Sequence, residues 1–98
     1  MEQVYAALVE TPLGLRTGKI TFEVVNNKIN GVLELLGKTE KFDGIIKKNN
    51  EIEIKGTISL ATRQIQYRGT GVLEEEHVEL ELEGGRNRLK LKGNRWKE

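Results

Sequence analysis

Apolar and polar residues alternate along almost the whole chain, and this pattern constrains the fold more than any other feature. The segment KITFEVV (19–25) places Ile20, Phe22 and Val24 on one side. The segments EIEIKGTISL (51–60) and HVELELE (77–83) repeat the pattern. A repeat of two residues is typical of strands with one buried face, because successive side chains point to opposite faces. No segment has a helical repeat, so the sequence predicts an all-β chain.

Turn signals divide the alternating runs at regular intervals. One set recurs about every 24 residues: TPLG (11–14), LLGK (35–38), SLAT (59–62) and EGGR (83–86). A second set falls between them: Asn26-Asn27, Asn49-Asn50 and Glu75-Glu76. Asn and Gly accept the positive φ of tight hairpin turns, whereas Glu does not. Two turns in each repeat indicate a repeated hairpin, which predicts about eight strands joined in sequence order.

A trial register follows from pairing apolar residues across each turn. The expected pairs are Phe22 with Gly31, Leu33 with Phe42, Ile46 with Ile52, Leu60 with Ile65, Leu73 with Val78 and Leu80 with Leu89. Each register keeps the apolar residues on one face, and a slip by one residue would turn them outward. On the other face, Lys19 and Lys41 are expected to flank Glu34, and Asp43 to face Lys55.

Glycines on the inward face point to closure of the sheet. They are Gly31, Gly44, Gly56, Gly69, Gly71 and Gly93. A mid-strand glycine weakens a strand unless it serves curvature or a close approach. Rows of inward glycine let a sheet coil, and a coiled antiparallel meander removes its exposed edges by closing. We therefore expect an all-β, eight-stranded antiparallel up-and-down barrel forming one domain over residues 1–98. The alternative is a two-sheet meander sandwich.

Composition and charge pattern narrow the function classes. The chain has no cysteine, and its net charge is +1. The basic residues Arg86, Arg88, Lys90 and Lys92 alternate along one strand, but acidic residues precede them across the turn. Paired bases make a poor phosphate track, so we expect no nucleic-acid binding. No apolar run approaches the length of a membrane helix, and the N-terminus lacks a signal-peptide pattern. We expect a cytoplasmic protein without membrane insertion.

Residues with catalytic or metal-binding chemistry are sparse. His77 is the only histidine, and it lies on the outward face beside a turn, where solvent exposure is its simplest explanation. The carboxylates fall mostly on the outward face, so no pair is expected in a dry pocket. No spacing matches a metal loop or a phosphate-binding loop. We therefore expect no enzyme, no metal and no cofactor.

Two binding roles from different classes remain open. In the first, the barrel interior binds a small apolar ligand, with Phe22 and Phe42 in its lining and Tyr67 and Arg95 anchoring its polar end. A structural alternative is that Tyr67 fills the core and Arg95 covers one end. In the second role, the core is fully packed and the protein acts through its surface or as a homo-oligomer. Outward apolar residues favour that role: Val25, Val32, Ile45 and Val72.

Several short motifs carry a resemblance to known proteins. They are TPLG, Gly18, NKING (27–31), LLG, FDG (42–44), IKG (54–56), IQY (65–67), GTG (69–71) and GNR (93–95). The chain resembles a group of short uncharacterised bacterial proteins with repeated TPxG turns and a closing GxR. It is also similar in architecture to calycins, the lipocalins and fatty-acid-binding proteins. Arg95 would match the closing arginine of lipocalins, whereas their N-terminal Gly-x-Trp is missing. The resemblance implies a barrel fold, and fold likeness alone does not assign a function.

Overall fold

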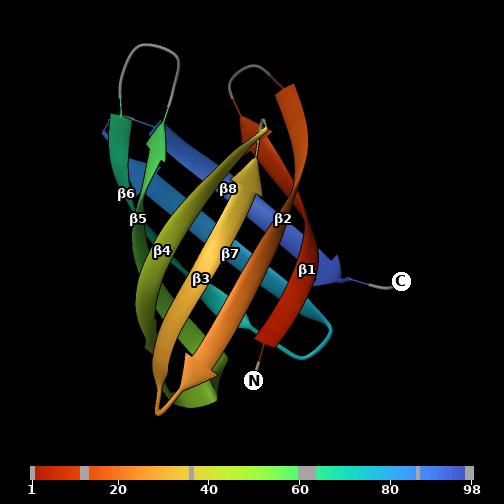
Figure 1. Ribbon diagram of the computed structural model, residues 1–98, viewed down its shortest axis with the longest axis vertical. Coiled ribbons are helices and arrows are strands. Elements are labelled where there is room, and N and C mark those ends of the chain that lie inside the picture. The colour runs from red at the N-terminus through yellow and green to blue at the C-terminus, as the bar shows by residue number, and fades with distance from the viewer. Residues whose placement is uncertain (1, 12–13, 36, 60–63, 86, 97–98) are drawn as a thin grey trace.

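The computed structural model is an eight-stranded antiparallel barrel, as the alternation and the turns predicted (Figure 1). It describes residues 2–11, 14–35, 37–59, 64–85 and 87–96. The strands are β1 (Glu2–Thr11), β2 (Gly14–Val25), β3 (Lys28–Leu35), β4 (Lys38–Ile46), β5 (Glu51–Ser59), β6 (Gln64–Leu73), β7 (His77–Gly84) and β8 (Asn87–Arg95), with a short 3-10 helix, η1 (Lys48–Asn50). Each strand pairs with the next, and β1 pairs with β8. The closed barrel confirms the main prediction and excludes the two-sheet sandwich.

The meander gives the barrel two different ends. The upper rim carries the connections β1–β2, β3–β4, β5–β6 and β7–β8, at the top of Figure 1. The lower rim carries the connections β2–β3, β4–β5 and β6–β7. At the β2–β3 turn Asn26 and Asn27 have φ of 51° and 67°, and in η1 Asn49 and Asn50 have φ of 62° and 61°. The asparagines thus supply the left-handed backbone that a tight turn needs.

The predicted register is right at the lower rim and wrong at the upper rim. Phe22 faces Gly31, Ile46 faces Ile52 and Leu73 faces Val78, as expected. At the upper rim, Leu33 faces Glu40 rather than Phe42, Ile58 rather than Leu60 faces Ile65, and Leu80 faces Leu91 rather than Leu89. In each case the observed pairing differs from the predicted pairing by two residues. A shift of two keeps every side chain on its face, so alternation cannot detect it.

The surface charge pairs change with the register. Lys19 still faces Glu34, and Asp43 still faces Lys55. Glu34 faces Thr39 instead of Lys41. In the last hairpin Arg88 faces Glu83, at 3.1 Å, and also reaches Glu81 at 3.8 Å. Lys90 and Lys92 face Glu81 and Glu79. The basic row on β8 is therefore lined by acids on β7, and these pairs are exposed, so each adds little stability.

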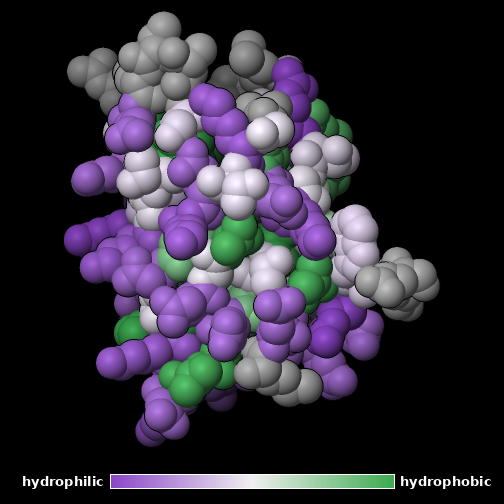
Figure 2. Space-filling view, viewed as in Figure 1, coloured by the Kyte–Doolittle hydropathy of each residue, from purple (hydrophilic) through white to green (hydrophobic). Residues whose placement is uncertain are grey.

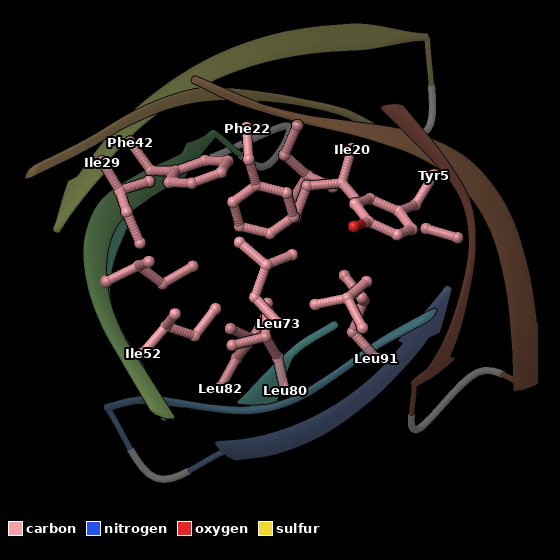
Figure 3. Close-up of a cluster of buried hydrophobic side chains, with 14 of the residues drawn as sticks. Tyr5, Ile20, Phe22, Ile29, Phe42, Ile52, Leu73, Leu80, Leu82 and Leu91 are labelled. Carbon is pink, nitrogen blue, oxygen red and sulfur yellow. The ribbon is translucent and has the colours of Figure 1, made fainter. Parts of the chain in front are cut away.

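The interior of the barrel is apolar. Figure 3 shows Tyr5, Phe22 and Phe42 along one wall and Leu80, Leu82 and Leu91 along the opposite wall, with Leu73 between them. The core side chains that are less than 2% exposed are Tyr5, Phe22, Ile20, Ile29, Leu33, Ile52, Leu91, Val9 and Val78. No charged residue is buried in the parts of the chain that the structure describes. Apolar burial is therefore the main force that holds the strands together.

The outer surface is mostly polar, with separate apolar residues between charged ones (Figure 2). Val25 and Ile45 are 53% and 44% exposed, and they flank Lys28 on neighbouring strands. Val32 faces Lys41, whereas Ile45 faces Lys28, which lies four residues away from Val32 along β3. Val32 and Ile45 therefore lie apart on the outer surface. Trp96 lies under the ammonium of Lys19, 5.1 Å from the ring centre. In the described segments no helix has the length and apolar character needed to cross a membrane.

Candidate functional site

A row of alternating aromatic residues and glycines crosses the inner wall. It runs Phe22 (β2), Gly31 (β3), Phe42 (β4), Gly56 (β5) and Tyr67 (β6), each facing the next. A Cβ built on Gly31 would lie 2.2 Å from the Phe42 ring, and one on Gly56 would lie 2.7 Å from the Tyr67 hydroxyl. Each ring therefore occupies the space that a side chain on the neighbouring strand would need. Such pairing lets large rings fit into a small barrel.

The register shift explains how this row forms. The register expected from the sequence put Gly31 opposite Phe22, but it put Leu33 rather than Gly31 opposite Phe42. In the structure both phenylalanines adjoin Gly31, and their ring centres lie 5.4 Å apart in an edge-to-face contact. Phe22 makes a second edge contact, at 5.8 Å, with Tyr5. The structure thus brings three of the four predicted site residues, Phe22, Phe42 and Tyr67, into one row.

The hydroxyl of Tyr67 is buried without a hydrogen-bond partner. Tyr67 is 4% exposed, and its hydroxyl oxygen is the one buried side-chain polar atom without a partner in the described part of the chain. Burial, and secondarily the charge of Glu40, raise the pKa of Tyr67 to about 12. The group is therefore a neutral donor at neutral pH. An unpaired buried hydroxyl is costly, so it calls for an explanation.

The wall between β4 and β5 is incomplete beside this row. The two strands pair from Ile46–Ile52 up to Phe42–Gly56, where the ladder ends before the upper rim. Beyond that point two side chains of β4 reach the backbone of Ser59 on β5. The Glu40 carboxylate accepts a hydrogen bond from the Ser59 N–H at 3.1 Å, and the Lys38 ammonium donates one to the Ser59 carbonyl at 3.2 Å. Side chains thus join the strands where backbone hydrogen bonds are missing.

Arg95 lies at the opposite end of the barrel from Tyr67. Its guanidinium donates to the carbonyl of Glu75 in the β6–β7 turn at 3.1 Å, and stands 5.9 Å from the ring centre of Tyr5. Tyr67 adjoins Gly84 at the other end of β7. One small polar group cannot contact both residues. Arg95 instead covers the lower rim over Tyr5, whose hydroxyl donates to the carbonyl of Glu74 at 2.5 Å.

Two residues of this region were missed in the sequence. Glu40 shares the inward face of Phe42 and Gly44, so a carboxylate on that face was a readable signal. Tyr5 belongs to β1, where VYAALVE (4–10) mixes small and apolar residues, and neither face was singled out. Its burial to 0% exposure follows from its place between Ile20 on β2 and Arg95 on β8.

The two buried tyrosines give a matched test of the unpaired hydroxyl. Replacing Tyr67 with Phe removes an unsatisfied donor, so we expect the free energy of unfolding to rise by about 1 kcal/mol or more. Replacing Tyr5 with Phe removes a made hydrogen bond, and we expect a loss of about 0.5–1.5 kcal/mol. Urea unfolding followed by circular dichroism measures both. Equal losses in the two variants would mean that the Tyr67 hydroxyl has a partner in solution.

Two depressions open at the surface of the barrel. One, of about 630 Å³, crosses β4 to β7 and is lined by Gly56 and Tyr67 together with the charged residues Asp43, Lys55, Arg68 and Glu83. The other, of about 470 Å³, lies over β6, β7 and β8 and is lined by Glu79, Glu81, Lys90 and Lys92. Acidic and basic side chains line both depressions, so neither has a predominantly positive or negative charge. Within the described ranges, no three His, Cys, Asp or Glu side chains are grouped to hold a metal ion.

Comparison with known proteins supports the architecture. No protein-family model matches the chain, and no curated protein sequence matches it. Among solved structures, the chain is similar to apo lipid binding protein 8 of Caenorhabditis elegans, with a TM-score of 0.56 and 8% sequence identity. The similarity covers 96% of this chain and 94% of that chain. At this identity it shows a shared calycin-like barrel fold. Membership of the short bacterial group stays a prediction.

Proposed function

We propose that this protein binds a small apolar ligand inside the barrel, with the Tyr67 hydroxyl as the hydrogen-bond donor to that ligand. The observation that carries the proposal is the buried, unpartnered hydroxyl of Tyr67 in an otherwise apolar interior. Ligand pockets usually combine an apolar lining with a few polar groups that orient the ligand. A ligand oxygen at Tyr67 would satisfy a donor that the described residues leave unpaired.

The lining would come from the aromatic row. Phe42 lies next to Tyr67 across Gly56, and Phe22 lies next to Phe42 across Gly31. Arg95 has no part in this version of the site, because it is engaged at the lower rim. The proposal therefore keeps Tyr67, Phe22 and Phe42 from the sequence prediction and replaces Arg95 with Glu40 as the charged residue that acts on Tyr67.

The short β4–β5 ladder supplies a route to the interior. Four residues of β4 and three of β5 lie beyond the last pair, Phe42–Gly56. Opening this seam breaks no β4–β5 backbone hydrogen bond; it requires only release of the contacts of Lys38 and Glu40 with Ser59. The Lys38 contact is exposed and therefore weak, whereas the Glu40 contact is partly buried. The seam adjoins Gly56, above which the Tyr67 hydroxyl lies.

Nile red, an uncharged dye that fluoresces in apolar surroundings, tests the proposal. We expect saturable fluorescence with the folded protein, and competition by medium-chain esters. The variant Val25→Ser/Ile45→Ser is the control, because it removes two exposed apolar residues outside the barrel and should leave dye binding unchanged. Absence of saturable binding to the folded wild-type protein would contradict a ligand site in the interior. It would favour the packed-core alternative, in which the protein acts through its surface.

A further inference from the structure

We propose that the ligand is uncharged and carries a hydrogen-bond acceptor, such as an ester, ketone or ether oxygen, and that Glu40 excludes carboxylates from the site. This inference rests on the proposed ligand-binding function and specifies its ligand class. It concerns the upper half of the barrel, where Tyr67, Gly56 and Phe42 meet the open β4–β5 seam.

The donor at the site is neutral and single. The Tyr67 hydroxyl offers one proton, and in the part of the chain that the structure describes no other buried side-chain polar atom lacks a partner. A carboxylate placed in such surroundings would be desolvated with one hydrogen bond and no cation, which strongly disfavours its charged form. A neutral carbonyl or ether oxygen loses far less on leaving water. Tyr67 is therefore suited to a neutral acceptor.

The charge that acts on that donor has the wrong sign for an anion. Glu40 points inward from β4, two residues from Phe42, and its carboxylate is held by the Ser59 N–H on β5. Its negative charge acts on the Tyr67 hydroxyl and disfavours the phenolate. A ligand carboxylate at the same place would meet the same repulsion. Like charges brought together in a partly dry site cost affinity and act as a filter.

The cations around this site are exposed or face acids: Lys55 faces Asp43 and Arg68 faces Glu83. Lys38 is two residues nearer the upper rim than Glu40, is exposed, and donates to the Ser59 carbonyl. Arg95 lies at the lower rim, engaged with the Glu75 carbonyl and the Tyr5 ring. Lys38 is thus a cation joined directly to the seam, and the test has to separate its effect from that of Glu40.

A matched pair of ligands tests the inference. Methyl octanoate and octanoate share the acyl chain and differ in charge, and octanoate is ionised at pH 8. In competition with Nile red, we expect the ester to displace the dye at a concentration lower by at least about tenfold. Glu40→Gln keeps an acceptor for Ser59 but removes the charge. We expect it to tighten octanoate binding several-fold, and by a larger factor than any change in ester binding.

Tyr67→Phe, which should fold at least as stably as the wild type, should weaken the ester several-fold and reduce the preference for it. If octanoate binds as tightly as the ester or more tightly, the ligand class is overturned but the proposed function still stands. If octanoate binding is then lost in Lys38→Met, Lys38 is the residue that anchors the carboxylate. A dye that binds but that neither ligand displaces would also overturn the ligand class. If no dye binds at all, the proposed function fails together with this inference.

Discussion

Replacing Phe22 with alanine is expected to lower the free energy of unfolding by about 3–5 kcal/mol. Phe22 is 0% exposed and makes edge-to-face contacts with both Tyr5 and Phe42. Its removal takes away a large apolar area and leaves a cavity that the strands around it cannot close. Small domains have about 5–15 kcal/mol in total, so the variant should be close to unfolding. The urea midpoint, followed by circular dichroism, measures the loss.

Leu15→Ala is the control for this change. Leu15 lies on β2 like Phe22, but its side chain is 57% exposed, so its truncation should cost no more than about 0.5 kcal/mol. A loss below about 1.5 kcal/mol for Phe22→Ala would contradict the expectation. It would mean that Tyr5 and Phe42 refill the space, and hence that the aromatic row is less rigid than its contacts indicate.

The variant Gly71→Ala is expected to destabilise the barrel by about 3 kcal/mol, at the upper end of the usual cost of overpacking. A Cβ on Gly71 would lie 1.8 Å from the carbonyl oxygen of Glu79 on β7, and its other near neighbours are also backbone atoms. No rotamer change can relieve a clash with backbone. Gly44 has the same surroundings, since its Cβ would lie 2.0 Å from the carbonyl oxygen of Glu53. Thermal unfolding measures the effect.

Gly37→Ala separates this clash from the general cost of replacing glycine. Gly37 has a positive φ of 74°, and nothing lies within 4 Å of its Cβ position. Its substitution should therefore cost only the left-handed backbone conformation, about 1 kcal/mol. If both variants lose the same amount of stability, the backbone of β7 does not prevent a Cβ at Gly71.

The sequence determines the faces of the strands more firmly than their pairing. Alternation put Phe22, Tyr67 and the inward glycines on the correct face, because the apolar residues within one strand are enough to show which of its faces is buried. The register needs the turn position as well. Asn26-Asn27 supplies left-handed residues at both turn positions and fixed its hairpin. The glycines of EGGR (83–86) did not determine the register of the last hairpin, in which the structure pairs Gly84 with Asn87.

The candidate site was predictable only in part for the same reason. The inward position of Tyr67 followed from alternation, but its missing partner depends on what lies across Gly56, which needs the β5–β6 register. The end of the β4–β5 ladder has no local signal, because KTEKFDGII (38–46) and EIEIKGTIS (51–59) alternate along their full lengths. Arg95 was placed inward correctly, but the distance between the two rims is a property of the closed barrel rather than of either strand.

The incomplete ladder also has a mechanical consequence. β4 and β5 share five residue pairs, whereas β1 and β2 share ten and β5 and β6 share nine. Near the upper rim, β4 and β5 are therefore joined by side chains alone. Thermal motion will concentrate where the fewest hydrogen bonds resist it. The barrel wall should therefore open first between these two strand ends.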